Sequence, residues 1–457
     1  MAIQRFIPLC LLCLALPAWA APEPLAPLDA APESYFNDAL VAAYTANPRI
    51  LAERERQKAT DEDISQALSG FRPTANGTFE KGRQRTAFGG APRSYGDAES
   101  KSLTVDQPLF RGGATIAGYQ AAKQRVKAGQ ARLSAVEQEV LFQAAQAYMN
   151  VVQAQSILAL SRNNEEVLKK QLKAAQERFD VGEVTRTDVA QSEARLSNAT
   201  AQVIQSEGEL ISATAAYERV VGSKPEALLS SPENMPELPG SLTEALTIAR
   251  EENPGWLEAF HAEKSAKYDV RGNMARLLPQ VSLRGQMSRD EGAGVNGNSD
   301  FDQDSLKINV SIPLYQGGAE YSRIRESKAV ERQRGQQRAD ARQLVDEQVT
   351  QAWERLETAL ATIRAREDQI KAAEVALDGV RMEQEYGART VLDVLDAEQE
   401  LFLARSNLVR AESTRTVAVY NLLLSLGKLT PENLKLETAQ YEPQENYEDI
   451  KWLPAGF

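Results

Sequence analysis

The chain has 457 residues and carries 52 Lys and Arg against 64 Asp and Glu, a formal net charge of −12. This acidic balance argues against nucleic acid as a partner, because binding to phosphates needs a clustered excess of Lys and Arg. Beyond residue 20 there is no run of about 18 apolar residues, so no transmembrane helix is expected.

Residues 1–20 have the layout of a secretory signal peptide. Arg5 supplies the basic start, an apolar run follows, and residues 18–20 (Ala-Trp-Ala) form a small-x-small cleavage site. Both cysteines, Cys10 and Cys13, lie inside this segment, and no lipobox ending in cysteine stands at the cleavage site. We therefore expect an exported chain that is free of thiols and carries no lipid anchor there.

After the signal peptide the chain repeats itself at an offset of 205 to 206 residues. Asn47-Pro48 recurs as Asn253-Pro254, and an Asn N-cap followed by Pro is a signal for the start of a helix. Repetition over this length indicates two homologous halves. The expected division is a signal peptide at 1–20, a first repeat at 21–235, a second repeat at 236–427 and a tail at 428–457 near mid-height.

Two amphipathic strands are expected in each half, at 74–82, 102–109, 279–288 and 305–314. Strands of about 10 residues with one apolar and one polar face suit a tilted transmembrane β-strand. An ordinary half-buried hairpin of a soluble domain gives the same pattern. Because lipid tolerates no open sheet edge, four membrane strands would require several identical chains to close one barrel. The polar face would then line the lumen and the apolar face would meet lipid.

Each second strand of a half ends at a corner with the pattern Pro-Leu-Phe/Tyr-x-Gly-Gly, at 108–113 and 313–318. Pro cannot donate to a sheet ladder, and Gly-Gly permits backbone angles that other residues avoid. A very long helical pattern follows each corner, and from 114 to 179 it would measure roughly 100 Å. Its spacing of apolar and Ala residues is that of a coiled coil.

Each long helix is expected to turn back into a shorter return helix, at 187–221 in the first half. The return helix and the helix at 48–70 together match the long helix in length. Each half should therefore be a long helix packed beside two shorter helices that meet end to end near mid-height.

The two turns share a motif, at 181–189 and 386–394, in which Gly, Thr and Asp recur at matching positions. Gly terminates helices, and Thr185 and Thr390 are natural N-caps for the returning helices. A plain helical hairpin explains these two residue types. We expect Asp188, Asp393 and the lone Arg389 to serve another purpose, with Asp188 a partner for Arg389 across the turn.

These features resemble the TolC family of outer-membrane export channels over nearly all of the exported chain. The resemblance rests on the duplication, the Asn-Pro helix starts, the Gly-Gly corners and the paired turn motifs. The run at 387–396 (Gly-Ala-Arg-Thr-Val-Leu-Asp-Val-Leu-Asp) is close to the TolC type. With the missing lipobox, it resembles the outer-membrane component of type I protein secretion, such as the alkaline-protease (AprF-like) exporters.

The resemblance implies a mainly α fold with transmembrane β-strands, in which three chains share a 12-stranded antiparallel β-barrel continued by a long α-helical coiled-coil barrel. It implies an outer-membrane location with a large periplasmic part. The implied partners are two further copies of the chain, outer-membrane lipid, a periplasmic adaptor (membrane fusion) protein, an inner-membrane ABC transporter and an exported protein substrate. No cofactor or metal is implied.

The family's functional positions carry over to the two turns. Those matching the periplasmic entrance, or gate, are Thr187, Asp188, Arg389, Asp393 and Asp396. The family's tyrosine before the second turn is Gln384 here, and Tyr386 is the nearest substitute. The turn residues expected to contact the adaptor are Gly182, Glu183, Thr185, Gly387, Ala388 and Thr390.

Three alternatives stay open at this point. An enzyme is disfavoured, because the exported chain has one histidine, His261, and no recognisable catalytic motif. A soluble periplasmic coiled-coil adaptor would share the acidity and the heptads but would not need duplicated amphipathic strands. Multidrug efflux and protein secretion use one channel design, so the cargo is not fixed. The terminal Phe457 resembles the last residue of many outer-membrane barrels but follows no strand pattern.

Overall fold

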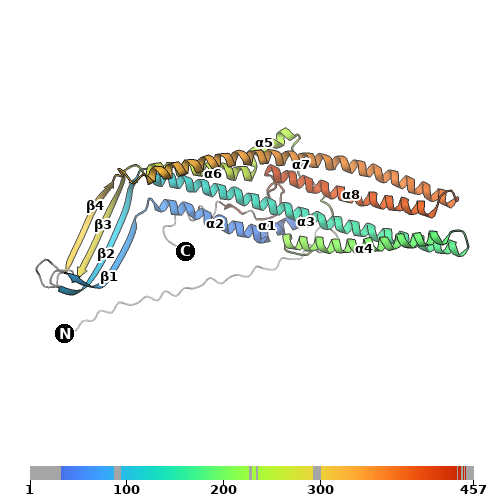
Figure 1. Ribbon diagram of the computed structural model, residues 1–457, viewed down its shortest axis with the longest axis horizontal. Coiled ribbons are helices and arrows are strands. Elements are labelled where there is room, and N and C mark those ends of the chain that lie inside the picture. The colour runs from blue at the N-terminus through green and yellow to red at the C-terminus, as the bar shows by residue number, and fades with distance from the viewer. Residues whose placement is uncertain are drawn as a thin grey trace, which may run out of the picture.

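The molecule is long, with a four-stranded sheet at one end and two helical hairpins reaching to the other (Figure 1). The computed structural model describes residues 32–86, 94–225, 229–232, 235–291 and 300–439, together with 441–443, 446 and 448. The expected signal peptide and Phe457 lie outside these residues. Within the described part of the chain, no helix is both long and apolar enough to cross a membrane.

The two halves repeat element for element. The first half comprises α1 (Pro32–Ala46), α2 (Pro48–Ser69), β1 (Thr74–Thr86), β2 (Ser94–Arg111), α3 (Ala114–Asp180) and α4 (Arg186–Val221). The second half comprises α5 (Leu242–Glu252), α6 (Pro254–Ala275), β3 (Gln280–Glu291), β4 (Phe301–Ser311), α7 (Ala319–Glu385) and α8 (Val391–Leu426). The long helices α3 and α7 both have 67 residues, and the return helices α4 and α8 both have 36.

The strands form one antiparallel sheet in the order β1-β2-β3-β4, so the two halves meet where β2 pairs with β3. Most of the strands are longer than expected, because the ladder continues past the alternating segments into charged ones. One example is the ion pair of Arg83 on β1 with Asp97 on β2, at 3.3 Å. At its C-terminal end β4 is shorter than expected, because it stops at Ser311 and the expected strand ran to residue 314.

The Gly-Gly corners turn strands into helices as expected. Gly113 is the N-cap of α3 in the left-handed conformation, with φ 87°, and Gly318 is its counterpart on α7, with φ 82°. At Gly112 a Cβ atom would lie 2.2 Å from the carbonyl oxygen of Ala275, at the end of α6. Only glycine therefore fits where the two halves approach each other below the sheet.

The expected end-to-end stacking of the shorter helices is confirmed, and it depends on two asparagines. The Asn47 side chain accepts from the Arg49 N–H at 2.9 Å, which caps α2, and donates to the Val220 carbonyl at the end of α4 at 2.8 Å. Asn253 does the same between α6 and α8, where it donates to the Ser425 carbonyl at 2.9 Å. Each asparagine therefore joins the start of one helix to the end of another.

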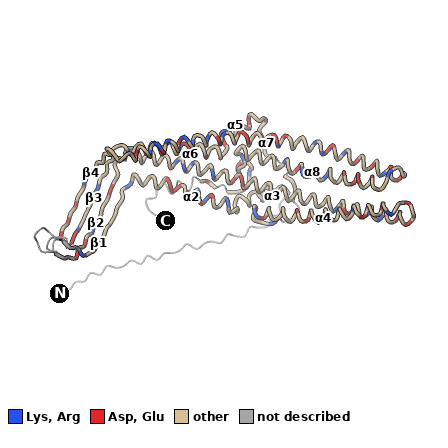
Figure 2. The backbone as a smooth tube through the Cα atoms, in the orientation of Figure 1, with Lys and Arg blue, Asp and Glu red and all other residues tan. Residues whose placement is uncertain are grey.

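The largest apolar core lies at mid-height, where α1, α3, α4 and α8 meet. Its centre is aromatic, with Phe36 packed edge-on against Tyr148 at 4.9 Å between ring centroids and at a tilt against Tyr420 at 5.3 Å. The seams of the two long helices are buried near mid-height, where most of the α3 seam belongs to this core and most of the α7 seam to a second apolar cluster. The buried seam residues there are Val140, Ala144, Ala147, Val151 and Leu158 on α3, and Val345, Val349, Ala352, Leu356 and Ile363 on α7. Toward the turns the expected seam is less completely buried, and Phe179 at the end of α3 is 43% exposed. Figure 2 shows charged residues of both signs along the length of this helical body.

Candidate functional site

The two helical hairpins end in turns of the same geometry at the end of the molecule opposite the sheet (Figure 1). Gly182 and Gly387 have left-handed φ angles of 81° and 74°. In each turn the next residue donates its N–H back into the long helix, from Glu183 to the Arg178 carbonyl at 2.9 Å and from Ala388 to the Glu383 carbonyl at 2.8 Å. Such bonds satisfy the last carbonyls of α3 and α7 and end both helices at defined residues.

A capping box starts each return helix. The Thr185 hydroxyl accepts from the Asp188 N–H at 3.3 Å, and the Asp188 carboxylate accepts from the Thr185 N–H at 2.8 Å. Thr390 and Asp393 form the same reciprocal pair at 3.3 and 2.9 Å. The expectation that a plain hairpin does not need the two aspartates is wrong, because each one satisfies a backbone N–H at its helix start.

Arg389 lies within its own hairpin and does not pair with Asp188. Its Nε is 2.8 Å from a Glu383 carboxylate oxygen, and one of its terminal nitrogens is 4.0 Å from Asp393. Asp188 is engaged in its capping box instead. Backbone and side-chain hydrogen bonds from Thr390 hold the pKa of Asp393 below its usual value, and Arg389 adds to this effect. Asp393 therefore stays ionised at neutral pH.

Asp396 connects the two hairpins. Its carboxylate is 2.5 Å from a guanidinium nitrogen of Arg195, so the ion pair joins α8 to α4. Sequence reasoning missed Arg195, because a contact between hairpins depends on how each one is rotated about its axis. Thr187, the remaining gate position, is exposed, as are all six turn positions that were matched to adaptor contacts.

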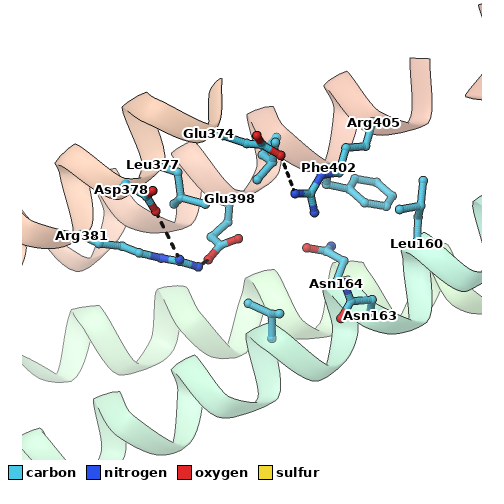
Figure 3. Close-up of a pocket in the computed structure, with 12 residues that line it drawn as sticks. Leu160, Asn163, Asn164, Glu374, Leu377, Asp378, Arg381, Glu398, Phe402 and Arg405 are labelled. Carbon is cyan, nitrogen blue, oxygen red and sulfur yellow. Dashed lines mark hydrogen bonds and ion pairs between the residues drawn. The ribbon is translucent and has the colours of Figure 1, made fainter. Parts of the chain in front are cut away.

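A polar cavity of about 370 Å³ lies between α3 and the α7–α8 hairpin (Figure 3). Arg381 pairs with Glu398 and lies 3.9 Å from Asp378, and Arg405 pairs with Glu374 at 2.8 Å. The sequence contained a signal for the two pairs that join α7 to α8, because Arg381 and Glu398, like Glu374 and Arg405, lie at nearly equal distances along the chain from Thr390. All these charges are compensated by partners within the hairpin.

The described residues hold no group of three or more His, Cys, Asp or Glu side chains that could bind a metal ion. His261 lies on α6 with its Nδ1 2.9 Å from the side-chain oxygen of Gln124. Burial, with Lys127 and Lys264 nearby, lowers the pKa of this histidine. It is a neutral, hydrogen-bonded packing residue.

Comparisons with known proteins agree with this architecture. The profile of the family named "Outer membrane efflux protein" matches residues 39–223 and 245–428. Outer membrane efflux protein BepC of Brucella suis biovar 1 (strain 1330) is 36% identical over 428 residues, covering 93% of this chain and 92% of BepC. Alkaline protease secretion protein AprF of Pseudomonas aeruginosa is 28% identical over 356 residues, covering 76% of this chain and 73% of AprF. The crystal structure of the Campylobacter jejuni CmeC outer membrane channel has the same fold, with a TM-score of 0.76 at 17% identity over 92% of this chain and 89% of CmeC.

These findings confirm the expected family but not the finer resemblance to the protease exporters, since the chain is more similar to BepC than to AprF. They also exclude the alternative of a soluble adaptor, because the matched family is one of outer-membrane proteins. The chain therefore belongs to the outer membrane efflux protein family, and it is a non-enzymatic outer-membrane channel of the TolC type with a long periplasmic helical tunnel.

Proposed function

We propose that three copies of this chain form one channel, each adding four strands to a shared 12-stranded barrel and two helical hairpins to a shared tunnel. The observation that carries the proposal is the sheet, whose outer strands β1 and β4 have no partner along their outer edges within the described chain. In lipid every backbone polar group must be paired, so these edges need neighbouring copies.

The two faces of the sheet suit this arrangement. On β4 the side chains of Leu306, Ile308 and Val310 are exposed by 75%, 69% and 55% in the single chain, which suits contact with lipid. The opposite face is polar and carries the ion pair of Arg284 with Asp106 at 2.8 Å, which suits a water-filled lumen. The apolar face would therefore point outward and the polar face inward.

The mass of the purified protein tests the assembly. In mild detergent the exported chain should behave as a trimer that resists SDS at room temperature and dissociates on heating. A monodisperse monomer with full β-content would contradict the shared barrel. The intact mass of the same sample tests the proposed removal of residues 1–20, which would leave a first repeat at 21–235, a second at 236–427 and the tail at 428–457.

We further propose that the hairpin turns form the periplasmic entrance and meet a periplasmic adaptor bound to an inner-membrane transporter. The support is their place at the end of the tunnel farthest from the sheet, together with the exposure of both turns. Cysteines at Glu183 and Ala388, in a chain whose native cysteines both lie in the expected signal peptide, should crosslink to the adaptor in cells. If only cysteines in the loop between β3 and β4 crosslinked to the adaptor, the periplasmic entrance would lie at the sheet end of the molecule, and the proposal would be wrong.

For the cargo, we propose efflux of small toxic compounds, which the greater similarity to BepC supports. Export of a protein such as a protease is the second candidate, supported by AprF and by the turn sequence at 387–396. The phenotype of a strain that lacks the gene distinguishes the two candidate cargoes. Efflux predicts several-fold lower inhibitory concentrations of detergents, dyes and antibiotics, whereas protein export predicts normal resistance and the loss of one or more proteins from the medium.

A further inference from the structure

The Gly-Gly corners of the two halves have the same backbone but different surroundings. Gly112 and Gly317 hold the same position of the motif and have φ angles of 64° and 63°. A Cβ atom at Gly112 would lie 2.2 Å from the Ala275 carbonyl oxygen and 2.8 Å from the Leu278 Cβ, because the junction of α6 and β3 packs against this corner. At Gly317 a Cβ atom would meet no atom of the described residues within 4 Å. The second corner therefore has the backbone of a packed corner without the packing.

The strands that lead into the two corners differ in the same way. β2 runs to Arg111, because Phe110 and Arg111 pair with the first two residues of β3. β4 ends at Ser311, although the position equivalent to Arg111 is Gln316. Within the described chain, the stretch that follows Ser311 therefore lacks the neighbouring strand that its counterpart in the first half has.

The side chains of the second corner are correspondingly bare. Leu314 and Tyr315 are exposed by 91% and 80%, whereas their counterparts Leu109 and Phe110 are exposed by 56% and 50%. Phe110 is flanked by Val281 of β3, whereas Tyr315 has no strand beside it among the described residues. A surface that is partly covered in the first half is thus open in the second.

We propose that a second copy of this chain packs against the second corner with its own junction of α2 and β1. This junction is the duplicate of the α6–β3 junction, since Ser69 and Ala275 are the last residues of α2 and α6. The chain's own α2–β1 junction is out of reach, because β1 and β4 are the two opposite edges of the sheet (Figure 1). Gly317 then lies against the Ser69 carbonyl of the second copy. This inference rests on the proposed trimer and specifies the contact that joins its chains.

The duplication also fixes how β4 pairs with β1 of the neighbouring copy. Within the first half Thr74 lies opposite Asp106, and within the second half Gln280 lies opposite Ser311. These are equivalent pairs, because β1 and β3 are offset by 206 residues and β2 and β4 by 205. The hairpins of both halves therefore have the same register, and the register of β2 with β3 can be transferred to β4 with β1 of the next copy.

In the transferred register Ser311 lies opposite Thr78 of the second copy, because their counterparts Asp106 and Arg284 lie opposite each other. The segment after Ser311 then continues β4, as β2 continues past Asp106. Pairing along this seam satisfies the backbone groups at the outer edges of β1 and β4, as lipid requires.

An ion pair distinguishes this seam between copies from the seam between β2 and β3. Lys307 and Glu80 are both exposed, and neither forms an ion pair within the described residues. In the transferred register Lys307 lies opposite Gly82 of the second copy and diagonal to its Glu80, and a diagonal position is within reach of long side chains. The equivalent diagonal of β2 and β3 has two uncharged residues. The two charges therefore match only where one copy meets the next.

Disulfide crosslinking tests the register. Ser311→Cys with Thr78→Cys, in a chain whose native cysteines both lie in the expected signal peptide, should give a covalent trimer on mild oxidation. Directly opposite Cα atoms lie about 4.5–5.5 Å apart, which a disulfide can bridge. The matched control is Ser311→Cys with Asn76→Cys, which moves one cysteine two places along the same face. Diagonal Cα atoms are about 7–8 Å apart, so we expect roughly fivefold less crosslinking.

Two glycine variants test the contact at the corner. Gly317 and Gly318 both have positive φ angles, and a Cβ atom at either would meet no atom of the described residues within 4 Å. Gly317→Ala and Gly318→Ala therefore introduce similar backbone strain within one chain. Only the Cβ at residue 317 would strike the Ser69 carbonyl of the second copy, because Gly113, the counterpart of Gly318, has equally open surroundings. We expect Gly317→Ala to lower the temperature at which the trimer dissociates in SDS by several degrees more than Gly318→Ala does.

Charge reversal tests the ion pair with the same measurement. Lys307→Glu should lower the dissociation temperature, because it sets two carboxylates against each other across the seam. Lys307→Glu with Glu80→Lys restores opposite charges and should bring the temperature back to that of the native trimer.

Three results would overturn the inference: a crosslinking yield through Thr78 no higher than through Asn76, equal effects of the two glycine variants, or no rescue by the double charge reversal. The cysteine pairs keep the test decisive if a glycine variant fails to assemble. Native mass spectrometry reports the trimer separately. A monomer would contradict the trimer together with this inference, whereas a trimer with another register would contradict only the inference.

Discussion

The helices α3 and α7 occupy the same place in the two repeats and have the same length, yet their surroundings differ. α3 packs against α1, α2, α4, α6 and α8, whereas α7 packs against α5, α6 and α8. Along α7 the side chains of Leu344, Val375 and Met382 stay exposed by 49%, 74% and 63%. The duplicated helix thus has a central position in one half and an edge position in the other, and we infer that its bare surface is covered by another chain.

The residues at equivalent positions follow this difference. One repeat earlier, the three exposed apolar residues of α7 correspond to charged residues of α3, namely Glu139, Lys170 and Glu177. Conversely, Leu141 is fully buried on α3, and its counterpart on α7 is Asp346, which pairs with Arg250 of α5 at 2.8 Å. The seam that holds each hairpin together is common to both copies, and the other faces have been adapted to different neighbours.

The largest expected effect comes from the equivalent pair Leu141 and Asp346. Leu141→Ala should cost about 2–5 kcal/mol, because it removes buried methyl groups and leaves a cavity in the mid-height core. Asp346→Ala should cost less than about 1 kcal/mol, since its ion pair is partly exposed. Thermal unfolding in detergent, followed by circular dichroism, measures both. Equal losses would mean that α7 is as fully packed as α3.

Exchanging surface residues between the copies should weaken the assembly rather than the chain. Val375→Lys with Met382→Glu gives α7 the residues of α3, and if a neighbouring chain covers them the trimer should lose roughly 1–3 kcal/mol. The measurement is the temperature at which the trimer dissociates in SDS. The reverse exchange, Lys170→Val with Glu177→Met, serves as the control and should leave that temperature unchanged. An unchanged dissociation temperature in the first variant would show that no neighbouring chain covers this face of α7.

The hairpin ends offer a smaller effect. Arg195 joins α4 to α8 through Asp396, whereas the equivalent position in the second repeat is Glu400 and Arg389 pairs only within its own hairpin. Arg195→Glu replaces one attraction of about 0.2–1 kcal/mol per chain by a repulsion. Three copies acting together could shift an open–closed population by roughly 5- to 150-fold. We expect this variant to raise single-channel conductance in planar bilayers more than Arg389→Ser does, and the opposite order would assign the gate to Arg389.

The smallest expected effect concerns Asp61, whose equivalent in the second repeat is Lys267. Asp61 is buried and accepts from Gln57 at 2.7 Å and from Asn446 of the tail at 3.0 Å. Burial raises the pKa of this carboxyl above its ordinary 3.8. The folded chain therefore holds the proton more tightly than the unfolded chain, so the contribution of Asp61 to stability is greatest in acid and falls as pH rises from 3.8 through the raised value.

Asp61→Asn, which keeps an acceptor and can pair with a rotated Asn446 amide, should remove this dependence. Its gain over the native protein should be below about 1 kcal/mol at neutral pH and should shrink in acid. Melting temperatures measured from pH 3.5 to 8 test this. A difference that stays constant over that range would mean that Asp61 does not titrate differently on folding.

Most of the helical architecture could be predicted from the sequence because its signals are local. The Gly-Gly corners, the Asn-Pro starts and the seam of Val140 and Ala144 each report on backbone angles or on one helix face. The strands were less predictable, because pairs such as Lys81 with Glu99, at 3.1 Å, extend the ladder without an alternating apolar pattern.

The candidate site was only partly predictable for the same reason. The capping role of Asp188 and Asp393 is a local signal that could have been recognised from the Thr-x-x-Asp spacing. The partner of Asp396 could not, because Arg195 lies 201 residues away and its position depends on how the two hairpins pack. Long-range ion pairs leave no periodic trace in the sequence.

The joints at Asn47 and Asn253 have a consequence for how such tubes can change length during evolution. α3 and α7 are continuous, whereas the column beside each one is built from two helices that abut at an asparagine. An insertion of one heptad in α3 alone would push the joint apart by about 10 Å unless α2 or α4 gained the same length. The second repeat would then need the same insertion, because otherwise the two helical hairpins would end at different heights. Lineages with longer or shorter tunnels should therefore carry coordinated insertions or deletions in both repeats, while the connectors at mid-height are free to vary in length one at a time.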